Sequence, residues 1–229
     1  MMHSEVRGRM PFRDREEAAR RLAEALGGYR VRPMEKRERR PLVLAIPRGA
    51  VPMGAIIAKA LGGELDVVLV HKLGAPDNPE LAIGAVDETG GLYLNEEAAA
   101  LRVGDAYLER ERRTQLERLH HRRTLYTAAH PPVDPAGRIV IIVDDGLATG
   151  ASMVAALRAV RARHPAKLIA ATAVAPAQTL ELIKGLADEV VCLEIPQVFY
   201  AVGQFFLDFP QVPDEQVISA LRQFVPPCS

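Results

Sequence analysis

The chain has 229 residues, of which 48% are hydrophobic, so it can bury one complete core as a single domain with a lid or hood. Lys and Arg number 29, as do Asp and Glu, and this balance argues against a global basic field for nucleic acid. The charge is uneven, because residues 1–41 hold 12 basic and 7 acidic side chains whereas residues 176–229 hold 2 and 7.

No targeting signal is visible in the sequence. The segment MMHSEVRGRMPF has no apolar stretch of the kind found in signal peptides, and no apolar run approaches the length of a membrane span. The two cysteines, Cys192 and Cys228, form no C-x-x-C pair, which argues against a disulfide framework. We therefore expect a soluble cytoplasmic protein.

The start of the chain predicts a helix and then a turn. Asp14 and Glu17 have the spacing of a capping box, and the apolar stripe that follows them ends at Gly27-Gly28. The charged run from Met34 to Arg40 is typical of a solvated turn, with a polyanion patch as the alternative.

A strand–loop–helix unit comes next. Leu42–Ile46 is typical of a buried strand, and Pro52 suits the first turn of a helix that ends near Leu61. The loop between them is Pro47-Arg48-Gly49-Ala50. Its amides, its arginine and the helix N-terminus together favour an anion site, whereas the simpler interpretation is a tight turn with a solvent-facing arginine.

Two further strands are predicted at Asp66–Val70 and Ala82–Val86, separated by turn residues. The first strand would deliver His71 and Lys72 to its carboxyl end, and the second ends at Asp87-Glu88. We expect His71 to be a packed or solvated histidine.

Residues 95–135 do not continue the alternation of buried strands and helices, and they predict a helical insertion. Asn95 suits the cap of a short helix over 96–101, and a longer, arginine-rich helix is expected over 105–126. Interspersed acids favour a solvated helix with ion pairs, and a lid or partner helix is the alternative. His120 and His121 are adjacent and do not share a helix face, which argues against a metal site there.

The most informative stretch is Ile139–Ser152, with the sequence IVIIVDDGLATGAS. Its first five residues are apolar and β-branched, as in a buried strand. Asp144 and Asp145 follow at once, and a loop of small residues then leads into an alanine-rich helix. A Walker A loop and a G-x-G-x-x-G motif are absent. A response-regulator receiver would need an acceptor Asp at the end of a later strand and a Lys beyond it, but Asp188 precedes its strand and no Lys follows Lys184.

The loop and the helix N-terminus together form a predicted phosphate cradle, because backbone amides and the helix dipole converge there. The residues of this phosphate loop are Gly146, Ala148, Thr149, Gly150, Ala151 and Ser152. The two carboxylates would repel a phosphate, so they must face hydrogen-bond donors or positive charge. A sugar phosphate meets both demands.

The remaining core elements are predicted as a strand at Lys167–Val174, a helix at Gln178–Leu186 and a strand at Glu189–Leu193. Strands that alternate with helices at this spacing indicate a parallel sheet. Five of the eleven Phe and Tyr residues then cluster near the end of the chain: Phe199, Tyr200, Phe205, Phe206 and Phe209. They would close the core, or form a hood whose rings stack on a flat base.

The stretch around Asp144 and Asp145 resembles the phosphoribosyl diphosphate (PRPP) motif of type I phosphoribosyltransferases. The loop Pro47–Ala50 resembles the pyrophosphate loop of that family, and KLG-x-P-x-NPELAIGAV resembles an uncharacterised bacterial branch of it. The resemblance implies an α/β fold with a mostly parallel twisted sheet, helices on both faces, a helical insertion and a small hood. Within one domain over 1–229, we expect the lid at 95–135 and the hood at 195–229.

The resemblance also implies the roles of the site residues. The two acids would hold the ribose 2′ and 3′ hydroxyls, the phosphate loop the 5′-phosphate, and Arg48 and Lys72 the pyrophosphate. The implied reaction transfers the 5-phosphoribosyl group of PRPP to or from a nitrogenous base or amine, with pyrophosphate as the leaving group. Mg²⁺ would be carried on the pyrophosphate and ribose oxygens, with no ion held by the protein alone.

One position departs from the family pattern. Relatives specific for 6-oxopurines place an Asp where this chain has Ala148, so a 6-oxopurine acceptor is disfavoured. A catalytic base would come from Asp87 or Glu88, and the hood residues expected to bind the acceptor are Tyr200, Phe205 and Phe206. A second hypothesis is a non-catalytic PRPP- or nucleotide-sensing regulator, and a third is an RNA-binding accessory that uses the arginine-rich helix. A homodimer is a further expectation.

Overall fold

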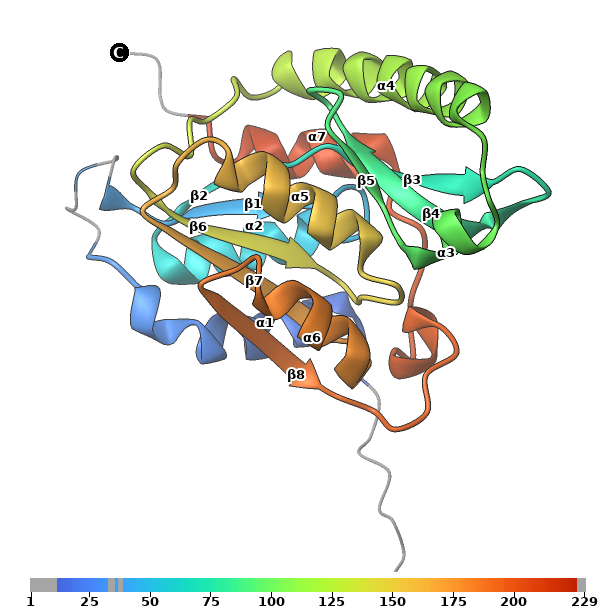
Figure 1. The fold of residues 1–229 in the computed structure, drawn as a ribbon. Helices are drawn as coiled ribbons and strands as arrows, with labels where there is room; N and C mark the ends of the chain where they lie inside the picture. Colours follow the sequence, from blue (N-terminus) through green and yellow to red (C-terminus); the bar gives the residue numbers. More distant parts are fainter. Residues whose placement is uncertain (1–11, 33–35, 37–38, 226–229) are drawn as a thin grey trace, which may run out of the picture.

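The structure, a computed structural model, describes residues 12–32, 36 and 39–225. Within these residues the main sheet has five parallel strands in the order β2-β1-β6-β7-β8 (Figure 1). They are β1 (Leu42–Ala45), β2 (Glu64–Val67), β6 (Ile139–Asp144), β7 (Lys167–Val174) and β8 (Glu189–Glu194). The predicted mostly parallel sheet is confirmed. The predicted turn at 34–40 lies largely outside the described residues, as does Cys228.

Helices cover both faces of this sheet (Figure 1). On one side lie α1 (Arg15–Ala25), continued by the short helix η1 (Gly27–Tyr29), together with α2 (Val51–Leu61) and α7 (Asp214–Arg222). On the other side lie α5 (Ala151–Arg161) and α6 (Ala177–Lys184). In β6, Ile141 and Val143 pack into the first core and Val140 and Ile142 into the second. Burial on both faces explains why this strand is a continuous apolar run.

A second sheet is antiparallel and has three strands within the described residues: β3 (Val70–Ala75), β4 (Asn78–Asp87) and β5 (Leu92–Leu94). The prediction of one strand over Asp66–Val70 with His71 and Lys72 at its end is therefore wrong. The chain leaves the parallel sheet after Val67 and continues into the hairpin β3–β4 of the second sheet. Asp66 marks the break, because its buried carboxylate accepts from the amides of Val67 and Val133 at 2.7 and 2.9 Å.

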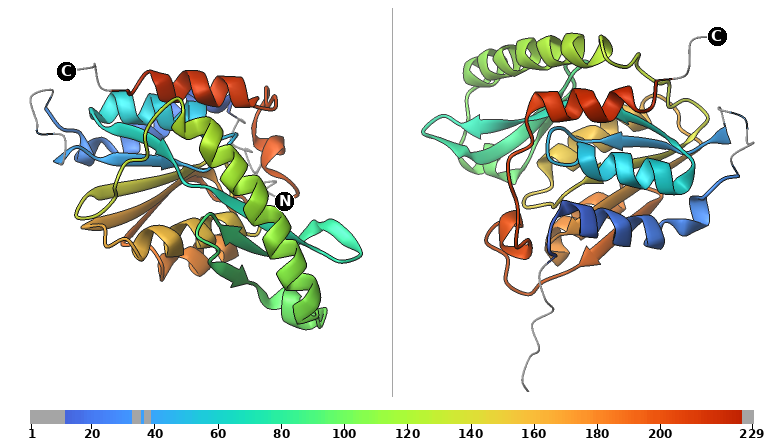
Figure 2. Two further views of the ribbon diagram at one scale, coloured as in Figure 1. Left: turned by 90° about the horizontal axis from the view of Figure 1, so that it is seen from above. Right: turned by 180° about the vertical axis from the view of Figure 1, so that it is seen from behind.

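The insertion forms α3 (Glu96–Ala100) and the long helix α4 (Asp105–Thr127), close to the predicted bounds. Helix α4 crosses the outer side of the small sheet (Figure 2). Its fully buried residues are Gln115, Leu119 and Tyr126, and much of its remaining surface is partly or fully exposed, as the charge pattern indicated. No helix in the described part of the chain is long and apolar enough to cross a membrane.

The C-terminal segment returns to the start of the chain through the short helix η3 (Val202–Phe205) and a bridge between Phe206 and Phe12. The ring of Phe206 is 6% exposed and packs between the rings of Phe12 and Phe209 at centroid distances of 5.4 and 4.7 Å. This ring therefore closes the core, which was one of the two interpretations of the aromatic cluster.

Candidate functional site

Two loops meet at the carboxyl edge of the parallel sheet, because β1 and β6 are hydrogen-bonded neighbours. The loop after β1 carries Arg48 and Gly49, and the loop after β6 carries Asp145 and the phosphate loop. A Cβ atom placed on Gly49 would lie 2.3 Å from Asp145 Oδ2, so a side chain at this position would displace the carboxylate. The two loops predicted from separate parts of the sequence thus form one continuous surface, at the edge where open α/β sheets bind ligands.

Asp144 ends β6 and Asp145 follows it, and both are largely shielded from solvent. Burial raises the pKa of Asp144, and the neighbouring carboxylate of Asp145 raises it further. Burial also raises the pKa of Asp145, against the opposing effects of Arg15 and Lys72. Hydrogen-bond donors or a cation at this site would therefore stabilise the charged form of the two carboxylates.

Lys72 acts on the same two acids, but it does not lie at the end of a parallel strand as predicted. It lies within β3, opposite Ala85 of β4, yet its charge lowers the pKa of both Asp144 and Asp145. Its strand neighbour His71 points to the other side, since Arg122 and Arg118 of α4 act on it and burial lowers its pKa. The alternation of side chains along a strand separates the two residues.

Arg15 was not among the predicted site residues. Its Nε atom donates to Asp145 Oδ2 at 2.8 Å, and both side chains are 13% exposed. Arg15 is the first residue of α1, 130 positions before its partner. Only the packing of α1 across the sheet brings the two together, so no sequence motif could have identified the contact.

The phosphate loop has a geometry suited to an anion. Gly150 has φ of +76° and precedes the first turn of α5, where Thr149 Oγ1 reaches the Ala151 amide only at 3.5 Å. Thr179 Oγ1 donates to the carbonyl of Ala148 at 2.7 Å, which ties the loop to α6. Gly150 provides no side-chain cap for α5, so the amides of the first helical turn can bind an anion, with the helix dipole behind them.

Arg48 has a partner that the sequence did not suggest. Its Nη1 atom lies 3.4 Å from Asp214 Oδ2 at the start of α7, and the hydroxyl of Tyr126 also donates to Asp214. The peptide between Pro47 and Arg48 is cis. Because the Arg48–Asp214 pair is about one-third exposed, it is a weak surface pair, and Arg48 is free to exchange this carboxylate for a phosphate oxygen.

A pocket of 460 Å³ lies beside the phosphate loop. Its lining comes from the phosphate loop, the start of α6 and the segment after β8: Ala148, Pro176, Ala177, Gln178, Ile195, Pro196, Gln197, Phe199 and Tyr200. Tyr200 is 87% exposed at its edge, and Phe205 supports Phe199 with ring centroids 5.4 Å apart. The expectation for Phe206 needs correction, because its ring is enclosed in the core and is not available to a ligand.

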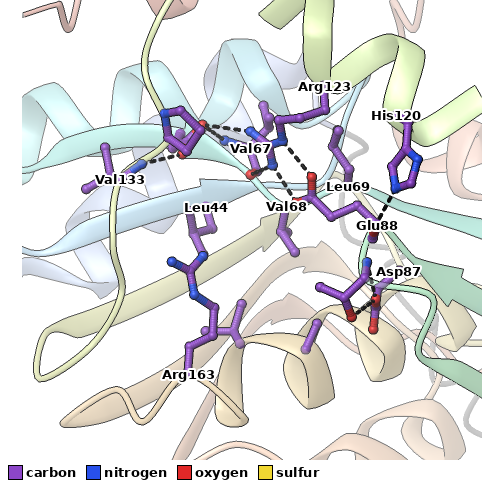
Figure 3. Close-up of a pocket in the computed structure, with 15 residues that line it drawn as sticks. Leu44, Val67, Val68, Leu69, Asp87, Glu88, His120, Arg123, Val133 and Arg163 are labelled. Carbon is purple, nitrogen blue, oxygen red and sulfur yellow. Dashed lines mark hydrogen bonds and ion pairs between the residues drawn. The ribbon is translucent and has the colours of Figure 1, made fainter. Parts of the chain in front are cut away.

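Glu88 also needs correction. It forms two hydrogen bonds with Arg123, at 2.5 and 2.6 Å, in a separate pocket beneath α4 (Figure 3). That pocket is also lined by Ala159 and Val160 at the end of α5, whereas the phosphate loop lies at the start of this helix. The carboxylate of Glu88 is thus engaged by Arg123, in a pocket whose lining does not include Asp144 or Asp145. Asp87 is engaged in its own turn, accepting from Thr89 and Gly91.

The described residues contain no group of three or more His, Cys, Asp or Glu side chains that could hold a metal ion. A cation at this site would therefore need ligand oxygens from a bound substrate as well as the carboxylates. This arrangement suits Mg²⁺, which keeps several waters and takes one or two carboxylates plus substrate phosphates.

Comparisons with known proteins agree on one family. A family model described as phosphoribosyl transferase domain matches residues 15–210. The Mycobacterium tuberculosis (strain H37Rv) protein Rv0571c, provisionally named a phosphoribosyl transferase, is 38% identical over 211 residues, which are 92% of this chain and 46% of the relative. The chain spans about half the length of the curated relatives it matches. The crystal structure of TT1426 from Thermus thermophilus has a TM-score of 0.77 and 46% identity, over 95% of this chain and 100% of that one.

Proposed function

The chain belongs to the phosphoribosyl transferase domain family, and on this premise we propose that it transfers the 5-phosphoribosyl group of PRPP to a nitrogenous base or amine. One observation carries the proposal. Gly49 lies so close to Asp145 that the two loops proposed to bind anions and the pair of acids share one surface. PRPP has an anionic group at each end of a ribose that bears two hydroxyls, so it matches this order of groups.

Each group has a part in the proposed reaction. The bond between ribose C1 and the pyrophosphate oxygen breaks, and its electron pair leaves with the pyrophosphate. A nitrogen of the acceptor bonds to C1 and then loses its proton. Arg48, Lys72 and the amide of Gly49 would stabilise the leaving group, and such preorganised groups are worth about 3–4 kcal/mol each when well placed. Asp144 and Asp145 would hold the ribose hydroxyls and lie near the positive charge that develops on C1.

Mg²⁺ fits this site as an ion that arrives with its substrate. When bound, it would neutralise part of the charge that grows on the pyrophosphate. The residues suited to hold it through ribose and phosphate oxygens are Asp144 and Asp145, whose pKa is raised mainly by burial, so a nearby cation would favour their charged form.

The pocket beside Ala148 is the best candidate for the acceptor. Asp, Glu, Lys, Arg and His are all missing from its lining, which offers the amides of Gln178 and Gln197 and the rings of Phe199 and Tyr200. Such a surface suits a flat, neutral acceptor. Ala148 supplies no carboxylate, which supports an acceptor other than a 6-oxopurine.

The proposal is tested by incubating the protein with PRPP, Mg²⁺ and each of a panel of bases and amines. The readout is the release of pyrophosphate. Release with at least one acceptor, lost in Asp145→Asn, is expected. Tight PRPP binding without turnover of any acceptor would favour the non-catalytic regulator instead. The expectations of a homodimer and a cytoplasmic location rest on the sequence alone and stay predictions.

A further inference from the structure

Arg15 connects three segments that are far apart in the sequence. Its Nε donates to Asp145 Oδ2 at 2.8 Å, and its Nη1 donates to the carbonyl of Pro210 at 2.6 Å. The centre of its guanidinium lies 3.6 Å from the centroid of the Phe209 ring. A Cβ on Gly49 would also lie 3.3 Å from Arg15 Nη2, so the same group borders the loop after β1.

The backbone around Arg15 is fixed from both sides. Asp14 caps α1 by accepting from the Glu17 amide at 2.8 Å, which fixes the start of the helix. The residues just before the helix pair with the C-terminal segment, since the Phe12 amide donates to the Phe205 carbonyl at 2.7 Å and the Leu207 amide to the Phe12 carbonyl at 2.8 Å. The guanidinium is thus held in place before any ligand arrives.

We propose that Arg15 is a positioning residue for Asp145, holding its Oδ2 atom so that Oδ1 is presented to a ribose hydroxyl. The inference rests on the proposed function, because it assumes that this carboxylate binds ribose. An aspartate side chain has two rotatable bonds, so its carboxylate would otherwise sample several orientations beside Gly49. The fork of Arg15 fixes one of them, and its stacking on Phe209 fixes the fork.

The charged groups around Asp145 come from three elements: Asp144 from β6, Lys72 from β3 and Arg15 from α1. Arg15 contacts the carboxylate directly, so its loss would remove both a hydrogen bond and an adjacent positive charge.

Arg21 offers a matched control on the same helix. It forms an ion pair with Glu194 at 2.8 Å and lies 4.7 Å above the ring of Phe12, but it does not contact Asp145. Replacing Arg21 therefore removes an ion pair and a stacking contact of the same kind without touching the proposed ribose site.

The experiment titrates PRPP with Mg²⁺ calorimetrically into the wild type, Arg15→Gln, Arg15→Lys and Arg21→Gln at neutral pH. Arg15→Gln should weaken binding about 10- to 100-fold. Arg15→Lys should restore only part of the affinity, because a point charge keeps the ion pair but does not replace the planar fork. Arg21→Gln should leave the affinity unchanged.

Two results would overturn the inference alone, given a wild type that binds. One is an Arg15→Gln variant with wild-type affinity. The other is an equal loss in Arg15→Gln and Arg21→Gln, which would mean that any weakening of α1 suffices. A wild type that fails to bind PRPP would overturn the proposed function and this inference together, and thermal unfolding of each variant excludes loss of folding as the cause.

Discussion

Gly49 lies against the carboxylate of Asp145, so that a Cβ atom on Gly49 would come within 2.3 Å of Asp145 Oδ2. Gly49→Ala should therefore push this carboxylate out of position and weaken PRPP binding by about tenfold or more, a loss on the order of one charge-assisted hydrogen bond. Gly28→Ala is the control, because a Cβ there meets no atom within 4 Å. Calorimetry on both variants checks the prediction, and equal affinities for PRPP would contradict it.

Asp144 should lower the stability of the folded protein at neutral pH. Burial raises the pKa of Asp144, so the folded state binds this proton more tightly than the unfolded chain. The free energy of unfolding then falls as pH rises through the ordinary Asp pKa toward the raised one. Asp144→Asn removes this effect and should raise Tm at neutral pH, with about 2–4 °C for each kcal/mol gained.

The control for Asp144→Asn is Asp77→Asn, which alters an exposed carboxylate in the β3–β4 turn. Thermal unfolding over a range of pH should show the gain for Asp144→Asn disappearing in acid and no gain for the control. An Asp144→Asn variant that is less stable than wild type at neutral pH would show that the carboxylate stabilises the fold.

Arg48 should contribute to the binding of the pyrophosphate group of PRPP and not to the binding of its 5′-phosphate. Arg48→Ala should weaken pyrophosphate binding while ribose 5-phosphate binds nearly as in the wild type, because the two anions are assigned to different loops. Arg48→Lys should do less of the same, since a point charge replaces the planar fork only in part. Titration of each ligand separately checks this, and an equal loss for both ligands would refute the two-loop arrangement.

Tyr200 and Phe206 should respond in opposite ways to truncation. Tyr200 is 87% exposed at the edge of the acceptor pocket, so Tyr200→Ala should raise the acceptor KM and leave stability within about 0.5 kcal/mol. Phe206 is 6% exposed, so Phe206→Ala should cost about 3–5 kcal/mol of stability. Denaturant unfolding and steady-state kinetics separate the two effects, and a destabilised Tyr200→Ala with unchanged KM would remove Tyr200 from the acceptor pocket.

The sequence predicted those parts of the fold in which local pattern and tertiary environment agree. β6 is buried on both faces, so its apolar run identified it and placed Asp144 at its end. The phosphate loop needs Gly150 at positive φ before α5, and this local requirement is visible in the chain.

Other features depended on tertiary packing. The run from Asp66 to Val70 gave no sign that β2 ends at Val67, because the carboxylate that closes the turn is held by the distant Val133 amide. Lys72 was expected at the carboxyl end of a parallel strand, as a contact to pyrophosphate, and it lies instead within the antiparallel strand β3. The partners of Asp145 and Arg48, which are Arg15 and Asp214, come from the two ends of the chain and carry no motif.

The most direct test of the central claim is a calorimetric titration of PRPP with Mg²⁺ into the wild type, Asp144→Asn and Asp145→Asn. The account predicts binding to the wild type and a loss in each variant of about 1.5–3 kcal/mol, or roughly 10- to 100-fold, with the fold retained. Unchanged PRPP affinity in both variants would contradict the assignment of these acids to the ribose.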